Sequence, residues 1–261
     1  IEIIGELTSK PYVDMTIDVM WQFGVKVVNQ DYKIFKVKAG QKYQPRDYQI
    51  EPDASGASYF MAGAALTGRC VRFPGLSIMS KQGDVGFARV LAKCQMSNVN
   101  PASLQGQKYK VKGKSLEDCL EFYGTGELKG ISVDMNSMPD MVPTLAVLAM
   151  FAKGKTVIKN VANLRIKECD RLHALATEIR KFGIKIKELP DGLKIFGNPK
   201  LLITNYELRI TIKTYNDHRM AMAFAVAKLV MPDIIIENQD CTVKSFPEFW
   251  KEWHKICIPS L

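Results

Sequence analysis

The stretch Asn216-Asp217-His218-Arg219-Met220-Ala221-Met222 opens an apolar run that continues to Val230 and is interrupted only by Lys228. A segment that is apolar on all sides predicts a buried helix. Its polar residues lie at the amino-terminal end, where free backbone N–H groups and the helix dipole favour an anion. Arg219 and His218 are therefore candidates for binding a phosphate or a carboxylate. The alternative is an ordinary helix start, with Asp217 as the cap and Arg219 in solvent.

The same pattern occurs twice more in the chain. Asp53 precedes an apolar run at 61–66, and Asp140 precedes one at 145–152. Each of the three runs is followed by a short stretch typical of a strand, at 70–73, 156–158 and 234–236. Three copies of an acidic residue, a buried helix and a strand indicate a repeat architecture with quasi-threefold symmetry.

A second unit is also repeated. The segments 9–23 and 172–182 carry apolar residues at the spacing of one helical face, and both end in Phe-Gly, as expected for a left-handed helix cap. An alternating strand follows each, and the chain returns through Lys-Ile-Phe at 33–35 and 194–196. Weaker copies of the helix occur at 87–94 and 246–253. The repeating unit is thus helix, strand, helix, strand, strand, which places the chain in the α/β class.

Composition fits a globular protein of this class. The 261 residues suffice for one large domain or for one domain with part of another, and 47% hydrophobic residues can supply a core. No apolar stretch reaches about 18 residues without a charge, so we expect no membrane span and no membrane partner.

The cysteines and histidines give no sign of a disulfide framework or a metal site. Six cysteines without a Cys-x-x-Cys pair indicate reduced cytoplasmic thiols. Cys70, Cys94 and Cys119 are expected to be small core residues. The three histidines show no ligand spacing, so we expect no metal ion.

The net charge of +9 favours anionic partners. A nucleic-acid-binding module is one possibility, but the lysines are spread over every repeat and no aromatic-glycine RNA signature is present. Small phosphorylated substrates bound at helix starts explain the same charge. We therefore expect no nucleic-acid partner.

The first residues, Ile1-Glu2-Ile3-Ile4, are typical of the interior of a strand, with no initiator methionine and no signal peptide. Residues 1–50 also lack the buried helix that each later unit has. We expect the chain to begin in the middle of a domain.

Six motifs stand out along the chain: Ser9-Lys10-Pro11-Tyr12, Asp-Ala-Ser-Gly-Ala-Ser-Tyr-Phe at 53–60, Asp-Met-Asn-Ser-Met-Pro-Asp at 134–140, Lys-Glu-Cys-Asp-Arg-Leu at 167–172, Asn216 to Met222, and Cys-Thr-Val-Lys-Ser-Phe-Pro at 241–247. In this order they closely resemble the motifs of the 5-enolpyruvylshikimate-3-phosphate synthase (EPSP synthase) family. The resemblance implies the enolpyruvyl transferase fold, in which each of two domains is an inside-out α/β barrel of three repeat units. Residues 1–51 would be the last unit of the upper domain, and residues 52–261 would be the nearly complete lower domain.

By this resemblance the two-domain form is incomplete here, and the missing N-terminal segment of the same enzyme is an expected partner. That segment would carry the remaining substrate contacts, so we expect the chain to be inactive alone. The family works in the cytoplasm, or in the plastid in plants, and uses no cofactor.

The family transfers the enolpyruvyl group of phosphoenolpyruvate to the 5-hydroxyl of shikimate 3-phosphate and releases phosphate. Such a reaction needs carboxylates for proton transfer and cations for two phosphates and a carboxylate. The resemblance assigns proton transfer at the methylene carbon to Glu168, activation of the hydroxyl to Asp140, and the departing phosphate to Lys244. From the residues alone, each has a plainer alternative: a helix-start glutamate, a helix cap and a solvated lysine.

The resemblance also implies two binding sets. Phosphoenolpyruvate would be held by Arg171, His218, Arg219 and Lys244. Shikimate 3-phosphate would be held by Ser9, Tyr12, Asp140, Asn163 and Lys167. Plainer alternatives are a structural role for His218, a helix cap at Ser9, surface packing of Tyr12 and a turn at Asn163.

One departure from the family pattern lies inside the site. Cys169 stands where the family more often has threonine, next to Glu168. It would alter packing there or make the site sensitive to thiol reagents.

Two other functions share this fold. A sister enzyme transfers the same group to UDP-N-acetylglucosamine, although Lys167-Glu168 and the 216–222 motif favour the shikimate branch. A non-catalytic binding remnant is the other alternative, and the presence of Glu168, Asp140 and Lys244 argues against it.

Overall fold

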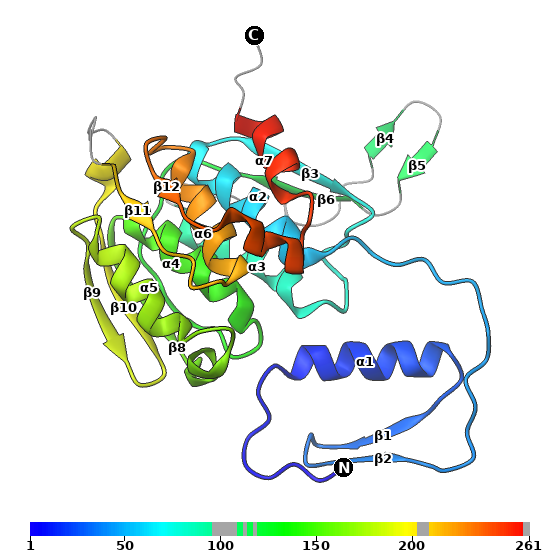
Figure 1. Cartoon of the computed structure of the whole chain (residues 1–261). Coiled ribbons are helices and arrows are strands. Elements are labelled where there is room, and N and C mark those ends of the chain that lie inside the picture. Colours follow the sequence, from blue (N-terminus) through cyan, green and yellow to red (C-terminus); the bar gives the residue numbers. More distant parts are fainter. Residues whose placement is uncertain (96–108, 112–113, 117–118, 203–208, 258–261) are drawn as a thin grey trace.

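The computed structural model describes residues 1–95, 109–111, 114–116, 119–202 and 209–257. Its centre is formed by the three predicted apolar helices, α2 (Ala54–Thr67), α4 (Val142–Phe151) and α6 (His218–Lys228), which pack on one another (Figure 1). All of α4 and nearly all of α2 and α6 are buried. A helix without a polar face is stable only when it is surrounded, which is why these three lie inside and the sheets outside.

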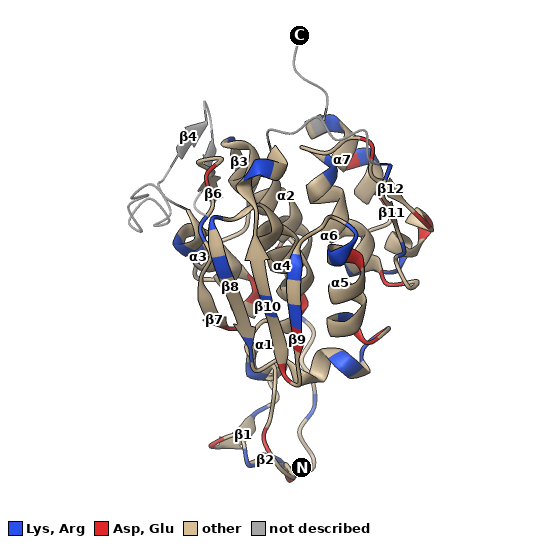
Figure 2. Cartoon of the chain, turned by 90° about the vertical axis from the view of Figure 1, so that its left-hand side faces the viewer, with Lys and Arg blue, Asp and Glu red and all other residues tan. Residues whose placement is uncertain are grey.

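A four-stranded sheet covers one side of this centre, in the order β7 (Ser132–Asp134), β8 (Gly154–Lys159), β10 (Gly192–Gly197) and β9 (Lys185–Leu189). β7 and β8 are parallel, and the other two pairings are antiparallel. Basic residues recur along β8, β9 and β10, coloured blue in Figure 2, and Lys155, Lys159, Lys185 and Lys187 are exposed. The positive charge of this sheet is therefore distributed over its solvent face, as predicted.

The remaining strands form small pairs. β3 (Cys70–Pro74) and β6 (Cys119–Tyr123) are antiparallel, whereas β11 (Thr211–Ile212) and β12 (Ile235–Ile236) are parallel. β4 (Tyr109–Val111) and β5 (Lys114–Leu116) form a further antiparallel pair. The strands predicted at 70–73, 156–158 and 234–236 are thus confirmed as parts of β3, β8 and β12.

Amphipathic helices lie outside the central three. They are α3 (Phe87–Cys94), α5 (Arg171–Arg180) and α7 (Phe249–Cys257), each at or near a predicted helix. Short 3-10 helices connect these elements: η1 (Gly83–Gly86), η3 (Pro139–Met141), η4 (Ala162–Ile166), η5 (Pro199–Leu202) and η6 (Gln239–Lys244). The aromatic rings of Phe249 and Trp253 on α7 lie 5.8 Å from Tyr59 and 5.3 Å from Phe60, so α7 packs directly on α2.

The first part of the chain contains α1 (Lys10–Gln22) and a hairpin of β1 (Val27–Gln30) and β2 (Ile34–Val37), and residues 1–51 are here called the α1 unit. It lies beside the body, to which the chain from 38 to 53 joins it (Figure 1). Gly24 and the corresponding Gly183 after α5 have φ of 89° and 71°, which confirms the left-handed conformation expected after each helix. The first strand begins at Val27, later than the alternation from Gly24 suggested.

One core prediction was wrong. Cys94 and Cys119 are buried, but Cys70 is exposed because it is the first residue of an outer strand. Of the helices in the described residues, none is both long and apolar enough to cross a membrane.

Candidate active site

Three acidic residues cap helices that begin near one another. Asp217 accepts the backbone N–H of Arg219 at the start of α6, and Asp53 accepts those of Ser55 and Gly56 at the start of α2. Asp170 accepts the N–H of His173 and caps α5, so the helix-start role suggested for Glu168 belongs to Asp170. The cap predicted for α6 is therefore confirmed, and the acidic side chain at each of these helix starts is explained by the unpaired backbone N–H groups there.

Asp140 does not cap a helix. It lies in η3, directly before α4, and no side-chain cap is present there. Its carboxylate instead accepts hydrogen bonds from two guanidinium groups, Arg171 Nη1 to Oδ1 at 2.9 Å and Arg219 Nη2 to Oδ2 at 2.8 Å. The Nζ of Lys167 is 3.7 Å from the same Oδ1. The plainer alternative for Asp140 is thus wrong, and three cations surround this carboxylate.

The charges around Asp140 determine its protonation. Burial alone would raise the pKa of its carboxyl group, but the nearby charges of Arg219, Arg171 and Lys167 outweigh burial and lower it. Asp140 is therefore an anion at neutral pH and can accept a proton or a hydrogen bond from a ligand hydroxyl.

Arg171 is the buried centre of the site. Its side chain is 1% exposed, and its Nε and Nη2 bind both oxygens of Asp217 at 2.6 and 3.2 Å. Nη2 also donates to Glu168 Oε2 at 2.6 Å, in addition to the bond from Nη1 to Asp140. Burial works to lower the pKa of the guanidinium, but its three carboxylate neighbours raise it. Arg171 therefore acts as a permanently charged brace between α5, α6 and η3.

Glu168 and Lys244 form the outer pair of the site. Lys244 Nζ donates to Glu168 Oε1 at 2.6 Å and comes from η6, 76 residues further along the chain. Burial alone would raise the pKa of Glu168, but the hydrogen bond from Lys244, with the charge of Arg171, lowers it to about 2. Glu168 is thus ionised whenever Lys244 remains bound to it.

The cations differ in how far a ligand can reach them. The exposed fraction of the side chain is 59% for Lys244, 35% for Lys167, 13% for Arg219 and 1% for Arg171. Arg219 is therefore largely enclosed, contrary to the solvated alternative. Asp140, Glu168 and Asp217 pair with these four cations, and the buried Asp84 lies within electrostatic reach of Arg219. An anionic ligand is expected to meet Lys244 and Lys167 first and Arg171 last.

His218 is a buried neighbour of Asp217 in this cluster. It is buried, its Nδ1 is 3.7 Å from Asp217 Oδ1, and that nitrogen has no hydrogen-bond partner among the described residues. Burial, together with the charge of Arg219, lowers the pKa of the imidazole, so it is neutral at pH 7. The histidine thus contributes no charge of its own to the site in this arrangement.

The expected shikimate 3-phosphate contacts come from the edge of the charged cluster. Tyr12 donates its hydroxyl to Asp84 Oδ2 at 2.7 Å. Ser9 occupies the N-cap position of α1 with φ of 56° but makes no side-chain cap, and its backbone N–H donates to Asn136 O. Asn163 lies in η4, with its Oδ1 buried and without a partner among the described residues.

The half-buried Cys169 contacts the cluster from the side. Its Sγ lies 3.7 Å from Asp217 Oδ2, and burial, followed by the charge of Asp217, raises the pKa of the thiol to about 12. A thiol that stays protonated is a poor nucleophile, so the packing role is favoured over reactivity.

Two carboxylates of this region carry roles that the sequence did not reveal. Asp217 was expected only as a cap, yet it also binds Arg171. Asp84 was not predicted at all, although it is 2% exposed and binds Tyr12. The one signal in the sequence for a role of Asp84 is that a charged residue stands within the short η1 segment. In the parts of the chain that are described, no three His, Cys, Asp or Glu side chains are grouped so that they could hold a metal ion.

The chain is similar in sequence to known enzymes. The family model for EPSP synthase (3-phosphoshikimate 1-carboxyvinyltransferase) matches residues 1–253. The 3-phosphoshikimate 1-carboxyvinyltransferases of Trichormus variabilis and Haemophilus influenzae are each 44% identical, over 258 and 259 residues, which is 98% and 99% of this chain. Each alignment covers 55% of the relative, so the chain spans about half the length of the curated relatives it matches.

Solved structures agree with these matches. An EPSP synthase from Acinetobacter baumannii superposes with a TM-score of 0.68 and 26% identity, over 91% of this chain and 53% of that one. The enolpyruvyl transferase NikO from Streptomyces tendae has a TM-score of 0.59 over 95% of this chain and 53% of its own, but only 14% identity, so it supports the fold alone.

Proposed function

Because the chain belongs to the EPSP synthase family, we propose that it supplies one substrate-binding face for the transfer of the enolpyruvyl group of phosphoenolpyruvate to the 5-hydroxyl of shikimate 3-phosphate, with release of phosphate. The observation that carries this proposal is the cluster in which Lys167, Arg171, Arg219 and Lys244 surround Asp140 and Glu168. The names of the relatives favour this reaction over transfer to UDP-N-acetylglucosamine.

The cations fit the charges of the two substrates. Phosphoenolpyruvate carries a phosphate and a carboxylate. We assign the phosphate to Lys244 and the carboxylate to Arg219, with the buried Arg171 and His218 completing this binding set. A guanidinium binds a carboxylate through two parallel N–H groups, whereas an exposed lysine can follow a phosphate as it leaves. Lys167, whose Nζ is 3.7 Å from Asp140 Oδ1, is assigned to shikimate 3-phosphate.

Asp140 is assigned to the attacking hydroxyl. Its carboxylate is ionised and fixed by Arg171 and Arg219, so it can accept the proton of the 5-hydroxyl as the oxygen attacks the enol carbon. The same guanidinium groups limit its basicity until a ligand redistributes their charge. Ser9, Tyr12 and Asn163 are proposed to bind the rest of shikimate 3-phosphate.

Glu168 is assigned to proton transfer at the methylene carbon. In the free chain its pKa of about 2 keeps it ionised but makes it only a weak base. A phosphate that binds Lys244 competes with Glu168 for the ammonium group and so raises the pKa of the glutamate. Glu168 can then carry the proton that is added to the methylene carbon and later remove one from the methyl group. Lys244 would neutralise the phosphate as it departs.

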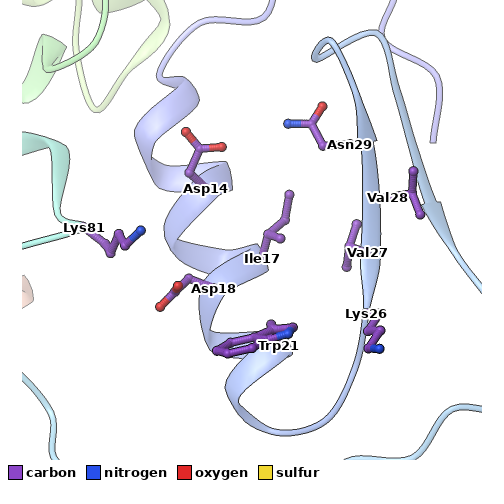
Figure 3. Close-up of a pocket in the computed structure, with 9 residues that line it drawn as sticks. All are labelled: Asp14, Ile17, Asp18, Trp21, Lys26, Val27, Val28, Asn29 and Lys81. Carbon is purple, nitrogen blue, oxygen red and sulfur yellow. The ribbon is translucent and has the colours of Figure 1, made fainter.

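We also propose that residues 1–51 are the last unit of an upper domain and residues 52–261 a lower domain. The α1 unit leaves apolar surface uncovered in this structure: no residue of α1 is buried, and Trp21 is 62% exposed. Ile17, Trp21 and Val27 line a groove of about 450 Å³ between α1 and β1, which Lys81 of the body also borders. Figure 3 shows these side chains. The proposed occupant is the part of the relatives that has no counterpart here, and activity is expected to require it.

The test is phosphate release from shikimate 3-phosphate and phosphoenolpyruvate. We expect no release by the chain alone, and release when it is mixed with the segment of the Escherichia coli relative that it does not match. Glu168→Gln should abolish that release. UDP-N-acetylglucosamine in place of shikimate 3-phosphate should give none. Calorimetry that detects no binding of either substrate, together with an inactive mixture, would refute the proposal.

A further inference from the structure

One loop of the body contacts the α1 unit in two places, at the chain segment that joins the unit to α2 and at the first turn of α1. This loop, Ser80–Gly86, binds the crossover at 51–54: Gln82 Nε2 donates to Pro52 O at 2.9 Å, and Gln82 Oε1 accepts the N–H of Ala54 at 2.9 Å. Ser80 donates its hydroxyl to Glu51. The point where the chain passes from the α1 unit into α2 is therefore held by the loop.

The same loop packs against the start of α1. A Cβ placed on Gly83 would lie 2.6 Å from Pro11 Cβ. The backbone of η1 therefore approaches this proline so closely that only glycine fits at residue 83. The same Cβ would also lie 3.3 Å from Ser137 O. The first turn of α1 thus fits into a recess of the body that a side chain at residue 83 would fill.

Asp84 connects these contacts through its carboxylate. Oδ2 accepts the hydroxyl of Tyr12 from α1 at 2.7 Å and the hydroxyl of Ser55 from α2 at 2.5 Å. Oδ1 is buried, with no hydrogen-bond partner among the described residues. Burial and the adjacent Asp84 raise the pKa of Tyr12, so its phenol remains the donor. A buried carboxylate that receives donors from both sides is costly to leave unpaired, and this makes the contact specific.

The contact lies at the edge of the candidate site. The charges of Asp140 and Arg219 act on both Tyr12 and Asp84. The groups that face Asp84 are thus Tyr12 from α1, Ser55 from α2, Arg219 from α6 and Asp140 from η3. Movement of α1 away from Asp84 would move Tyr12 and Ser9 away from Asp140.

We propose that Asp84 is a positioning residue that anchors the α1 unit to the body through Tyr12 and so sets the position of Ser9 and Tyr12 relative to Asp140. Asp84 itself contacts no substrate in this account. The part of the inference that concerns shikimate 3-phosphate rests on the proposed function, whereas the anchoring of α1 does not.

The experiment compares three variants of the whole chain. Tyr12→Phe removes the donor and keeps the ring, and Asp84→Asn removes the charge and keeps the shape. Tyr32→Phe is the matched control, because Tyr32 also donates to an aspartate, Asp14 at 2.8 Å, but within the α1 unit. Amide hydrogen exchange is measured at 9–14 and 83–86, and affinity for shikimate 3-phosphate is measured by calorimetry. If Asp84→Asn fails to fold, the comparison of Tyr12→Phe with the unaltered chain still tests the proposal.

Both Tyr12→Phe and Asp84→Asn are expected to speed exchange in the two segments by roughly tenfold, as for the loss of one hydrogen bond to a charged group. Both should weaken binding of shikimate 3-phosphate several-fold, and the double variant should do little more than either alone. Tyr32→Phe should leave exchange at 83–86 and the affinity unchanged.

Unchanged exchange in Tyr12→Phe would overturn the anchor. Faster exchange with unchanged affinity would overturn the positioning role and leave a purely structural contact. If the unaltered chain fails to bind shikimate 3-phosphate, the proposed function fails, and the exchange measurement alone then supports or overturns the anchor.

Discussion

Arg171→Met tests whether the candidate site is organised around a buried brace. Methionine has a similar length and fills much of the same space, but it leaves the carboxylate of Asp217 fully buried without a cation, with only the helix-cap N–H of Arg219 and the weak thiol donor of Cys169. Breaking a buried ion pair by removing one partner costs about 3–5 kcal/mol, because an uncompensated charge remains. Since Arg171 is 1% exposed, this figure needs no reduction for solvent screening. We expect the free energy of unfolding to fall by that amount.

A second substitution separates the lost charge pair from other effects. Asp217→Asn in the Arg171→Met background removes the unpaired charge, and asparagine is as good a helix cap as aspartate. The double variant should therefore recover about 2 kcal/mol of the loss, since replacing both partners of a buried pair by neutral groups is often close to neutral. Equal stability of the single and the double variant would show that the burial of Asp217 is not the cause.

Urea unfolding followed by circular dichroism measures both effects. The free energy of unfolding should fall with urea concentration at the same slope in every variant, so that a shifted midpoint reports a change in stability. Arg165→Met is the matched control. Arg165 also bonds to two carboxylates, Asp170 at 2.9 Å and Glu188 at 2.7 Å, but at the surface, where such pairs are worth about 1 kcal/mol or less. A loss below about 1 kcal/mol in Arg171→Met, or one equal to that in the control, would refute the account of the brace.

Three further perturbations follow from the same geometry. Lys244→Met should raise the pKa of Glu168 from about 2 by roughly one unit, the worth of a largely exposed ion pair, in a carbon-13 NMR titration; an unchanged pKa would contradict the pairing. Because the folded-state pKa is depressed, the stability that Glu168 contributes is present above its ordinary pKa of 4.5 and is lost as pH falls towards 2. Gly83→Ala should cost about 1–3 kcal/mol through its clash with Pro11, as thermal unfolding would measure. Asp53→Ala should cost about 1 kcal/mol and Asp53→Asn almost nothing, if the cap of α2 is the main role of this residue.

The central helices could be predicted from the sequence because each combines two local signals. Segments such as 145–152 are apolar on every side, and an acidic residue stands at or just before each helix start. Neither signal depends on distant parts of the chain, so no tertiary information was needed. The exposed Cys70 shows the limit of this reasoning: hydrophobic residues at the start of a strand are buried only if another element covers them, and local pattern does not tell which strands lie at the outside.

The charged residues of the site could be recognised from the motifs, but their partners could not. Arg171 and Asp217 are 46 residues apart, and Lys244 and Glu168 are 76 apart. Pairing over such distances is decided by how the helices α5 and α6 and the segment η6 meet. The sequence therefore indicated a set of cations that bind anions, whereas the structure adds that carboxylates of the protein already occupy them. Asp84 escaped prediction for the same reason, because α1 and α2 bury it only after they pack together.

This pairing divides the site into a fixed part and an exchangeable part. Arg171 and Asp217 are both fully enclosed, so separating them would leave a buried charge without a partner, and no ligand anion can reach the guanidinium without that cost. Lys244 and Glu168 are also paired, but Lys244 is 59% exposed and water can replace either partner cheaply. A phosphate that enters the site should therefore displace Glu168 from Lys244 and leave the Arg171 brace intact. The proton affinity of the displaced Glu168 then rises, and Glu168 is the carboxylate to which the proposed reaction assigns proton transfer at the methylene carbon.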